Sequence, residues 1–310
     1  VSFTGGNGLL LGNAGTTAST GIYNLSGGSI NTGTAVTNRG VMLGANNNSI
    51  NIFNLSGTGA LNMTAASGGT DSSVLHVGRF DSAANGTTNT FNQTGGTAKV
   101  AILSVGGNGA TGSSVTSTIN WTGGSFVANS FPRMAAGNTN TATVTIGGTA
   151  DVTLPAFPTV RGTSSTATLY FDGGVLKPAA SIAAYLGGVT NAYIKSGGAK
   201  FHTNSFNITV SQNLLTDPVS TAGGLTKEGS GTLSLTGTNT YTGNTAVNGG
   251  TLSLGNGTAN TGLANGADVS VASGTTLDLN YTGTDTIDGL TINGVAKAPG
   301  VWGSASSGAP

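Results

Sequence analysis

The sequence predicts an all-β protein, a parallel β-solenoid of about eleven coils, and three observations lead to this fold class. Glycine supplies 54 of the 310 residues, whereas charged residues make up only 6% of the chain. Short segments of alternating apolar and small polar residues recur between turns rich in glycine and asparagine. Each segment has one apolar edge, and that edge is buried only when similar segments stack above and below it.

The composition also narrows the class of protein. Glycine, serine, threonine and asparagine dominate, as they do in disordered chains, but 36% apolar residues in regular alternation favour a folded protein. Zero net charge argues against nucleic acid or an anionic membrane as a partner. No run is apolar enough for a transmembrane helix, and the absence of cysteine excludes a disulfide framework. No signal peptide is evident, so we expect a mature or excised portion of a protein.

A strand that ends in a glycine pair marks each coil in the first two hundred residues. The first glycines are 24 to 38 residues apart, and we interpret each interval as one coil. Ile30, Leu61, Ala98, Phe126, Ala150 and Leu176 are predicted to form one buried column, and Phe201 breaks its phase. The next residues, Asn31, Asn62, Lys99, Asp151 and Lys177, are then predicted to point outward, with Val127 as the exception. The clearest glycine markers are Tyr23–Gly28, Phe53–Gly57, Phe91–Gly96 and Ile119–Gly124.

A second marker lies between these glycine pairs. It closes a short apolar strand with one glycine, which we expect to adopt a positive φ at a corner. Its copies are Leu11-Gly12, Leu43-Gly44, Val77-Gly78 and Val105-Gly106.

The chain divides into three parts in this interpretation. Residues 1–211 form irregular coils, residues 212–223 a joint, and residues 224–310 a regular repeat followed by C-terminal coils, all within one continuous solenoid. Pro178–Leu186 fits either one helical turn or a loop. Val269–Val271, Thr276–Leu279 and Leu290–Ile292 continue the strand pattern.

The regular repeat, Gly224–Gly255, has three alternating segments, around Leu233, Val247 and Leu252. It resembles the autotransporter-associated β-strand repeat, a motif about a tenth as long as this chain. The residues that carry this resemblance are Gly224-Leu225-Thr226-Lys227, Gly231-Thr232-Leu233, Asn239-Thr240-Tyr241-Thr242-Gly243, Val247 and Gly250-Thr251-Leu252. The tail Asp285–Gly303 looks like the segment that follows this repeat in large secreted proteins of Gram-negative bacteria.

The resemblance implies a right-handed parallel β-helix of the passenger type, displayed outside a Gram-negative cell. In such families the repeat supports secretion and folding of a stalk and carries no catalysis. The export route and the anchor are not implied by these residues.

Few residues are available for chemistry. Catalytic β-helices that act on polysaccharides need two or three convergent carboxylates, but this chain has only ten acidic residues. We expect Asp151 and Lys177 to form a cross-coil ion pair. The densest polar cluster is Asp71, His76, Arg79 and Asp81, in which His76 should face away from the core as a surface histidine, with a general base or a ligand as the alternative.

The other patterns are weaker. His202 has no role that we can assign. Gly5–Gly8 and Gly106–Gly109 resemble the start of a calcium-binding nonapeptide but lack its aspartate, so we expect no metal and no other cofactor. Trp121 and Trp302 could stack on sugars, although the direction of Trp121 is undetermined. Asn24, Asn54, Asn92 and Asn120 begin glycosylation triplets, and we expect them instead to form a side-chain ladder between coils.

These observations favour a non-enzymatic extracellular β-solenoid, either a stalk, an adhesin, or a fibre subunit that stacks end to end. The alternative is a β-helix that binds or degrades polysaccharides. The expected partners are therefore further copies of the chain, or surface glycans.

Overall fold

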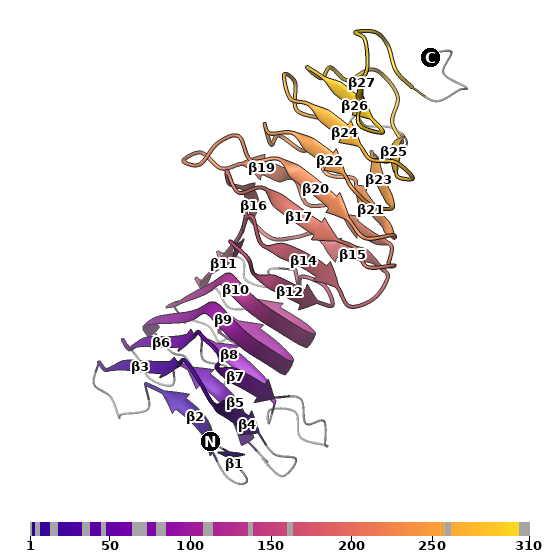
Figure 1. Cartoon of the computed structure of the whole chain (residues 1–310). Coiled ribbons are helices and arrows are strands. Elements are labelled where there is room, and N and C mark those ends of the chain that lie inside the picture. The colour runs from indigo at the N-terminus through magenta and orange to yellow at the C-terminus, as the bar shows by residue number, and fades with distance from the viewer. Residues whose placement is uncertain are drawn as a thin grey trace.

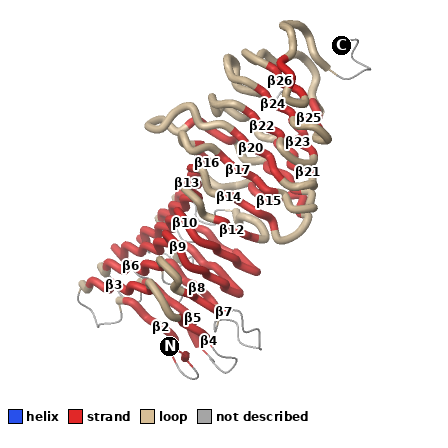
Figure 2. Tube along the Cα trace, viewed as in Figure 1, coloured by secondary structure: helices blue, strands red, loops and turns tan. Residues whose placement is uncertain are grey.

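The structure is a computed structural model, and all of its described residues lie in strands, turns and loops (Figure 2). It describes residues 2–3, 7–12, 18–32, 38–44, 48–63, 73–78, 85–107, 114–135, 139–159, 164–255, 257 and 262–303. The strands stack along one axis, with β1 at one end of the rod and β27 at the other (Figure 1). The protein is therefore a β-solenoid, as the sequence predicts.

The first face of the solenoid is a ladder of parallel strands, one for each turn. Register is continuous from strand to strand, and the solenoid has about eight turns. Its strands are β3 (Thr20–Leu25), β6 (Ile50–Leu55), β9 (Asn85–Val105), β10 (Ser114–Met134), β11 (Thr141–Gly147), β13 (Thr166–Asp172), β16 (Asn191–Ile194) and β19 (Leu214–Thr216).

The second face continues beyond both ends of the first, and β9 and β10 are long enough to bend through all three faces. β27 (Val295–Ala296) closes this face by pairing antiparallel to β26. Besides β9 and β10, the face comprises β1 (Ser2–Phe3), β4 (Ser29–Thr32), β7 (Ala60–Met63), β12 (Asp151–Leu154), β14 (Val175–Pro178), β17 (Ala199–His202), β20 (Leu225–Glu228), β22 (Thr245–Val247), β24 (Val269–Val271) and β26 (Leu290–Ile292).

The third face begins with β2 (Asn7–Leu11), β5 (Asn38–Leu43) and β8 (Val74–Val77). In the C-terminal half it is the five-stranded sheet of β15 (Ile182–Leu186), β18 (Ile208–Val210), β21 (Thr232–Leu235), β23 (Thr251–Leu254) and β25 (Thr276–Leu279). The expected number of eleven coils was too high. The sequence-based count treated the end segments as whole coils. In the structure, the described residues that precede β3 or follow β19 add no strand to the first face, so these segments do not complete a turn.

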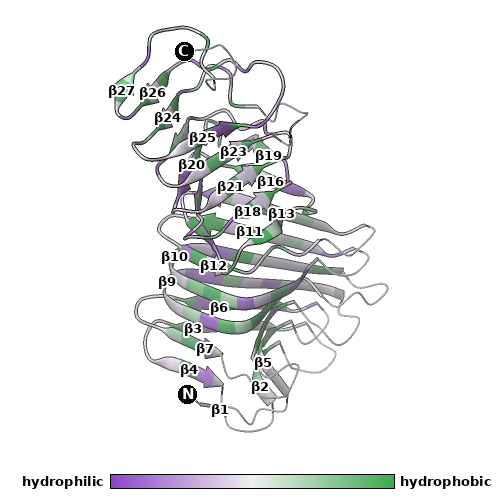
Figure 3. Cartoon of the chain, turned by 90° about the vertical axis from the view of Figure 1, so that its right-hand side faces the viewer, coloured by the Kyte–Doolittle hydropathy of each residue, from purple (hydrophilic) through white to green (hydrophobic). Residues whose placement is uncertain are grey.

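The core lies inside the ladder, where every second residue points inward. β6 shows this alternation, with Ile52 half-buried between the buried Asn51 and Phe53, and Figure 3 shows the same banding of hydrophobic and hydrophilic residues along the strands. Tyr23, Phe53 and Phe91 stack from turn to turn, with ring centroids 5.2 and 5.6 Å apart. Trp121 is also fully buried, in one column with Leu25, Leu55 and Gln93, so it points inward.

The predicted corner glycines are confirmed. Leu11, Leu43, Val77 and Val105 pair in register, and the glycines that follow them have φ values of 80°, 88°, 103° and 78°. A β-carbon on Gly44 would collide with the Asn89 side chain, which is buried beside it. Glycine is therefore required both by backbone conformation and by space.

The predicted buried column is correct except at one turn. Phe126 pairs with Val152 and not with Ala150, so Thr153, rather than Asp151, follows Val127 on the outside. The reason is the turn length, because Gly147 follows the strand residue Ile146 directly whereas Thr122 separates Trp121 from Gly123. Phe201 pairs with Leu176, and the turn before it takes up the one-residue offset.

The structure contains strands in two segments for which the sequence analysis predicted none. Pro178–Leu186 is neither a helical turn nor only a loop, since Ile182–Leu186 is strand β15. Leu214–Thr216, within the predicted joint, is β19 and pairs with β16, so the ladder runs on through this segment.

Candidate functional site

The outer surface of the first face carries an asparagine ladder. The amide nitrogen of each asparagine donates to the amide oxygen of the asparagine on the preceding turn, and the three distances are 2.7, 2.9 and 2.9 Å. Its members are Asn24, Asn54, Asn92 and Asn120. This confirms the prediction that these residues form a ladder between coils.

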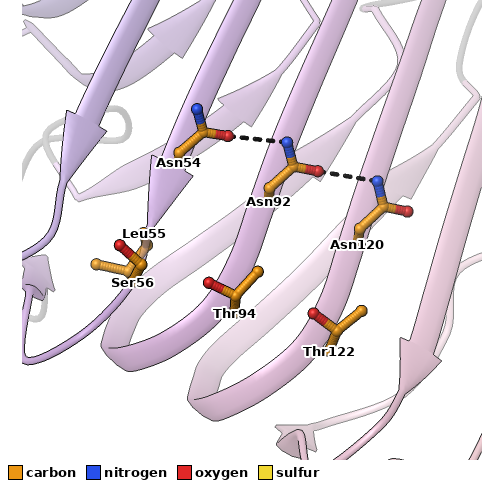
Figure 4. Close-up of a pocket in the computed structure, with 7 residues that line it drawn as sticks. All are labelled: Asn54, Leu55, Ser56, Asn92, Thr94, Asn120 and Thr122. Carbon is orange, nitrogen blue, oxygen red and sulfur yellow. Dashed lines mark hydrogen bonds between the residues drawn. The ribbon is translucent and has the colours of Figure 1, made fainter.

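A groove runs beside this ladder, where the first face turns into the second. Asn54, Asn92 and Asn120 lie along one side of it, and Thr94 and Thr122 lie along the other (Figure 4). The cavity has a volume of about 440 Å³, and no charged residue lines it. The ladder uses one N–H and one oxygen lone pair of Asn92, which leaves a second donor and a second acceptor on that side chain. The groove can therefore hydrogen-bond a polar, uncharged ligand.

The asparagine column continues as Thr145, Tyr170 and Tyr193 on later turns. The two tyrosine rings stack at 5.7 Å, and Lys195 Nζ lies 4.6 Å from the centre of the Tyr170 ring. Partial burial, with the nearby Asp217 carboxylate and Tyr193, raises the pKa of Tyr170. Because the rings cover each other, the face between them is closed to a sugar.

Three aspartates among the described residues hold structural contacts. Lys177 Nζ lies 2.6 Å from Asp151 Oδ2, which confirms the predicted cross-coil ion pair. The pair runs diagonally, because Asp151 is in register with Val175. Asp172 accepts a hydrogen bond from the Gly197 N–H at 3.1 Å. Asp217 accepts from the N–H groups of Val219 and Ser220, at 3.0 and 2.6 Å.

The predicted cluster around His76 is not placed as a group. Asp71, Arg79 and Asp81 lie outside the described residues. His76 is only 2% exposed, so the expectation of a surface histidine was wrong. Its ladder neighbours Met42 and Ser104 are buried too, because this part of the third face is covered on both sides.

The remaining candidates have local roles. His202 Nδ1 accepts a hydrogen bond from the Asn204 N–H at 3.2 Å, which is a contact within one turn. The Trp302 indole N–H donates to the Ala298 carbonyl. Among the described residues, no three histidine, cysteine or acidic side chains gather where they could hold a metal ion.

Lys227 is a buried structural residue that our sequence analysis matched to the repeat but did not place. It lies in the inward column of the second face, between Phe201 and Val247, and is fully buried. Its Nζ donates to the carbonyls of Glu228, Gly229 and Gly249, at 2.9, 2.8 and 2.9 Å. The signal was present in the sequence, since the alternation that buries Leu225 also points Lys227 inward.

The ammonium of Lys227 ties two successive turns together. Burial lowers the pKa of Lys227 from 10.5 to about 8, and the Glu228 carboxylate opposes this shift. The group is therefore still charged at neutral pH, and each of its three protons has a carbonyl acceptor. Two of the acceptors belong to one turn and the third to the next.

The stacked parallel strands and their shared register define the class of protein, a parallel β-solenoid. Residues 225–254 match the family model described as Passenger-associated-transport-repeat. This match and the solenoid fold are consistent with an autotransporter passenger β-helix. No curated protein and no solved structure matches the chain. The described residues include no helix that could span a membrane.

Proposed function

We propose that this chain is a non-catalytic stalk displayed on the outside of a Gram-negative cell, where it serves as an adhesin or as a unit of a fibre. The observation that carries the proposal is the continuous parallel ladder of the second face from β1 to β26, with a passenger-associated repeat as part of it. Such a ladder suits a rigid spacer, because each turn contacts only its neighbours and length is gained by adding turns.

The engaged aspartates support a role without catalysis. The Asp151 and Asp217 carboxylates hold an ion pair and a turn, whereas glycoside hydrolysis needs two carboxylates free to face one bond. Incubation of the full chain with neutral and acidic polysaccharides should therefore yield no cleavage products. Turnover that disappears in Asp71→Asn or Asp81→Asn would instead favour a polysaccharide-degrading enzyme.

We propose self-association through the ends of the ladder. In the described residues β3 pairs with β6 and β25 pairs with β23, each along one edge, and strand edges of this kind readily take up another strand. A further turn from a longer chain or from a second copy would satisfy them. Light scattering at micromolar concentration should detect species larger than 30.0 kDa. A strictly monomeric, intact chain would count against end-to-end stacking.

Glycan binding is a second candidate function, and the uncharged groove beside the asparagine ladder favours it. Asn92→Ala removes the middle of the ladder and should weaken retention on a glycan array. Asn129→Ala, an exposed asparagine of β10 outside the residues that line the groove, is the control and should leave retention unchanged.

A further inference from the structure

Above the asparagine ladder, the first face carries a regular grid of threonines. Four successive strands, β9, β10, β11 and β13, each present a Thr-x-Thr pair on the outer surface, and the register between them is unbroken. One column is exposed and the other half-buried. The first column is Thr88, Thr116, Thr141 and Thr166, and the second is Thr90, Thr118, Thr143 and Thr168.

The spacing of this grid follows from strand geometry. Side chains on one face of a strand recur every two residues, roughly 6.7 Å apart, and neighbouring strands lie about 4.8 Å apart. Threonine is stiff at χ1 because it is β-branched, so its methyl and hydroxyl groups inherit both repeats. Thr166 Oγ1 donates to Thr141 Oγ1 at 3.4 Å, which links two rows of the grid.

The two preceding strands extend the grid with isoleucine. Ile50 is in register with Thr88, and Ile22 is in register with Ile52 and through it with Thr90. Ile22 is 58% and Ile50 48% exposed. Isoleucine is β-branched like threonine, so it places a methyl group at the corresponding position of the grid. These side chains are exposed and lie outside the core, so the outer face offers methyl groups as well as hydroxyls to whatever it contacts.

A soluble ligand gains little from such a surface. Exposed hydroxyls bond water as well as they bond a ligand, and the grid offers neither charge nor an aromatic ring. The surface of an ice crystal, unlike liquid water, is periodic in two directions. The prism plane of hexagonal ice presents oxygens in a rectangular net whose two repeats are close to those of the grid. When the grid lies on this plane, the threonine methyl groups fit between the ice oxygens. The threonine hydroxyls then take positions that continue the ice lattice.

We infer that the threonine grid on the outer surface of the first face, with its isoleucine extension on β3 and β6, binds ice. The occupant is the surface of an ice crystal, and the interaction is additional to the proposed stalk or adhesin role. The threonine and isoleucine positions of the grid carry no charge, which is complementary to ice, because a charged side chain would have to lose its hydration shell on contact.

Ice-affinity partitioning of the full chain tests this inference. As ice grows slowly into a dilute solution, the wild-type protein should enter the ice fraction, whereas a protein that does not bind is left in the liquid. Thr116→Lys, in the middle of the exposed column, should lower the share of protein in the ice roughly tenfold. The matched control is Thr97→Lys, an exposed threonine on the second face, and it should partition like the wild type.

Circular dichroism must show that both variants keep the wild-type spectrum and melting temperature, and Thr141→Lys replaces Thr116→Lys if that variant unfolds. Exclusion of the wild type from ice overturns the inference. Equal partitioning of the two lysine variants overturns it as well, since the grid would then not be the binding surface. If the wild type is excluded from ice but binds microcrystalline cellulose, and Thr116→Lys loses that binding, the occupant is a crystalline polysaccharide and not ice.

Discussion

Replacing Lys227 by methionine should destabilise the solenoid strongly although it keeps the length and packing of the side chain. The substitution removes three charge-assisted hydrogen bonds of 2.8 to 2.9 Å. It leaves the carbonyls of Glu228, Gly229 and Gly249 without this donor. Losing a buried partner costs roughly 1–3 kcal/mol for each group, and methionine recovers part of this because no ammonium need be desolvated. We therefore expect a net loss of about 3 kcal/mol in the free energy of unfolding.

The assay is urea denaturation followed by far-ultraviolet circular dichroism. Lys200→Met is the matched control, because Lys200 lies on the neighbouring strand β17 with a half-exposed side chain, and it should shift the free energy by at most ~0.5 kcal/mol. An unchanged midpoint for Lys227→Met, or equal shifts for both variants, would refute the idea that the buried ammonium joins the two turns.

The pH dependence gives a second readout of the same residue. The pKa of Lys227 is lowered in the folded state to about 8 from 10.5. Between these values the unfolded chain therefore binds the extra proton, and stability should rise with pH. Below pH 8 both states are protonated and the cost of burying the charge is present in full. The wild type should gain stability relative to Lys227→Met from pH 8 to about 9.5, and tyrosine ionisation near pH 10 cancels in this comparison because both variants contain the same tyrosines. A constant difference over this window would contradict the assignment.

Three further substitutions, the first with a matched control, test the ladder. Gly124→Ala should cost about 2 kcal/mol or more by urea denaturation, because Gly124 has a positive φ and its added β-carbon would collide with the backbone of Gly95. Gly274→Ala, with a similar φ but open space around it, should cost only about 1 kcal/mol, and equal losses would refute the steric argument. Asn92→Leu interrupts the asparagine ladder and should lower the melting temperature by a few degrees, equivalent to roughly 1 kcal/mol; no change would mean that the ladder adds no stability. Asp151→Asn breaks the partly exposed ion pair and should change stability by less than about 1 kcal/mol, so a larger loss would mean that this ion pair contributes more than a surface pair.

The solenoid could be predicted because local rules and global stacking agree in this sequence. Leu43-Gly44 and Val77-Gly78 mark the same corner on successive turns, and the asparagines at 54 and 92 mark the same point on the outer face. The inward and outward positions were predicted wrongly where the length of a turn changes, as before Val152. A change of one residue reverses the direction of every side chain after it. The number of coils was overestimated because the sequence pattern of a strand near an end of the solenoid is the same as that of a strand in a complete coil.

The site was harder to predict than the fold. His76 alternates outward, yet it is buried by packing that alternation cannot reveal. Lys227 was matched as a motif residue, but a charged residue is normally assigned to the surface, and only the three carbonyls around it explain its burial. The threonine grid became visible only when strand register placed Thr116 between Thr88 and Thr141.

Cysteine pairs test the central claim, that successive turns lie in parallel register, most directly. The chain has no cysteine of its own, and in-register residues on neighbouring strands are about 4.8 Å apart, within disulfide reach. Thr118→Cys combined with Thr143→Cys should form a disulfide on oxidation. Thr118→Cys combined with Thr168→Cys, two turns apart, should stay reduced. If the second pair cross-links within one chain and the first does not, the turns are not stacked in this register.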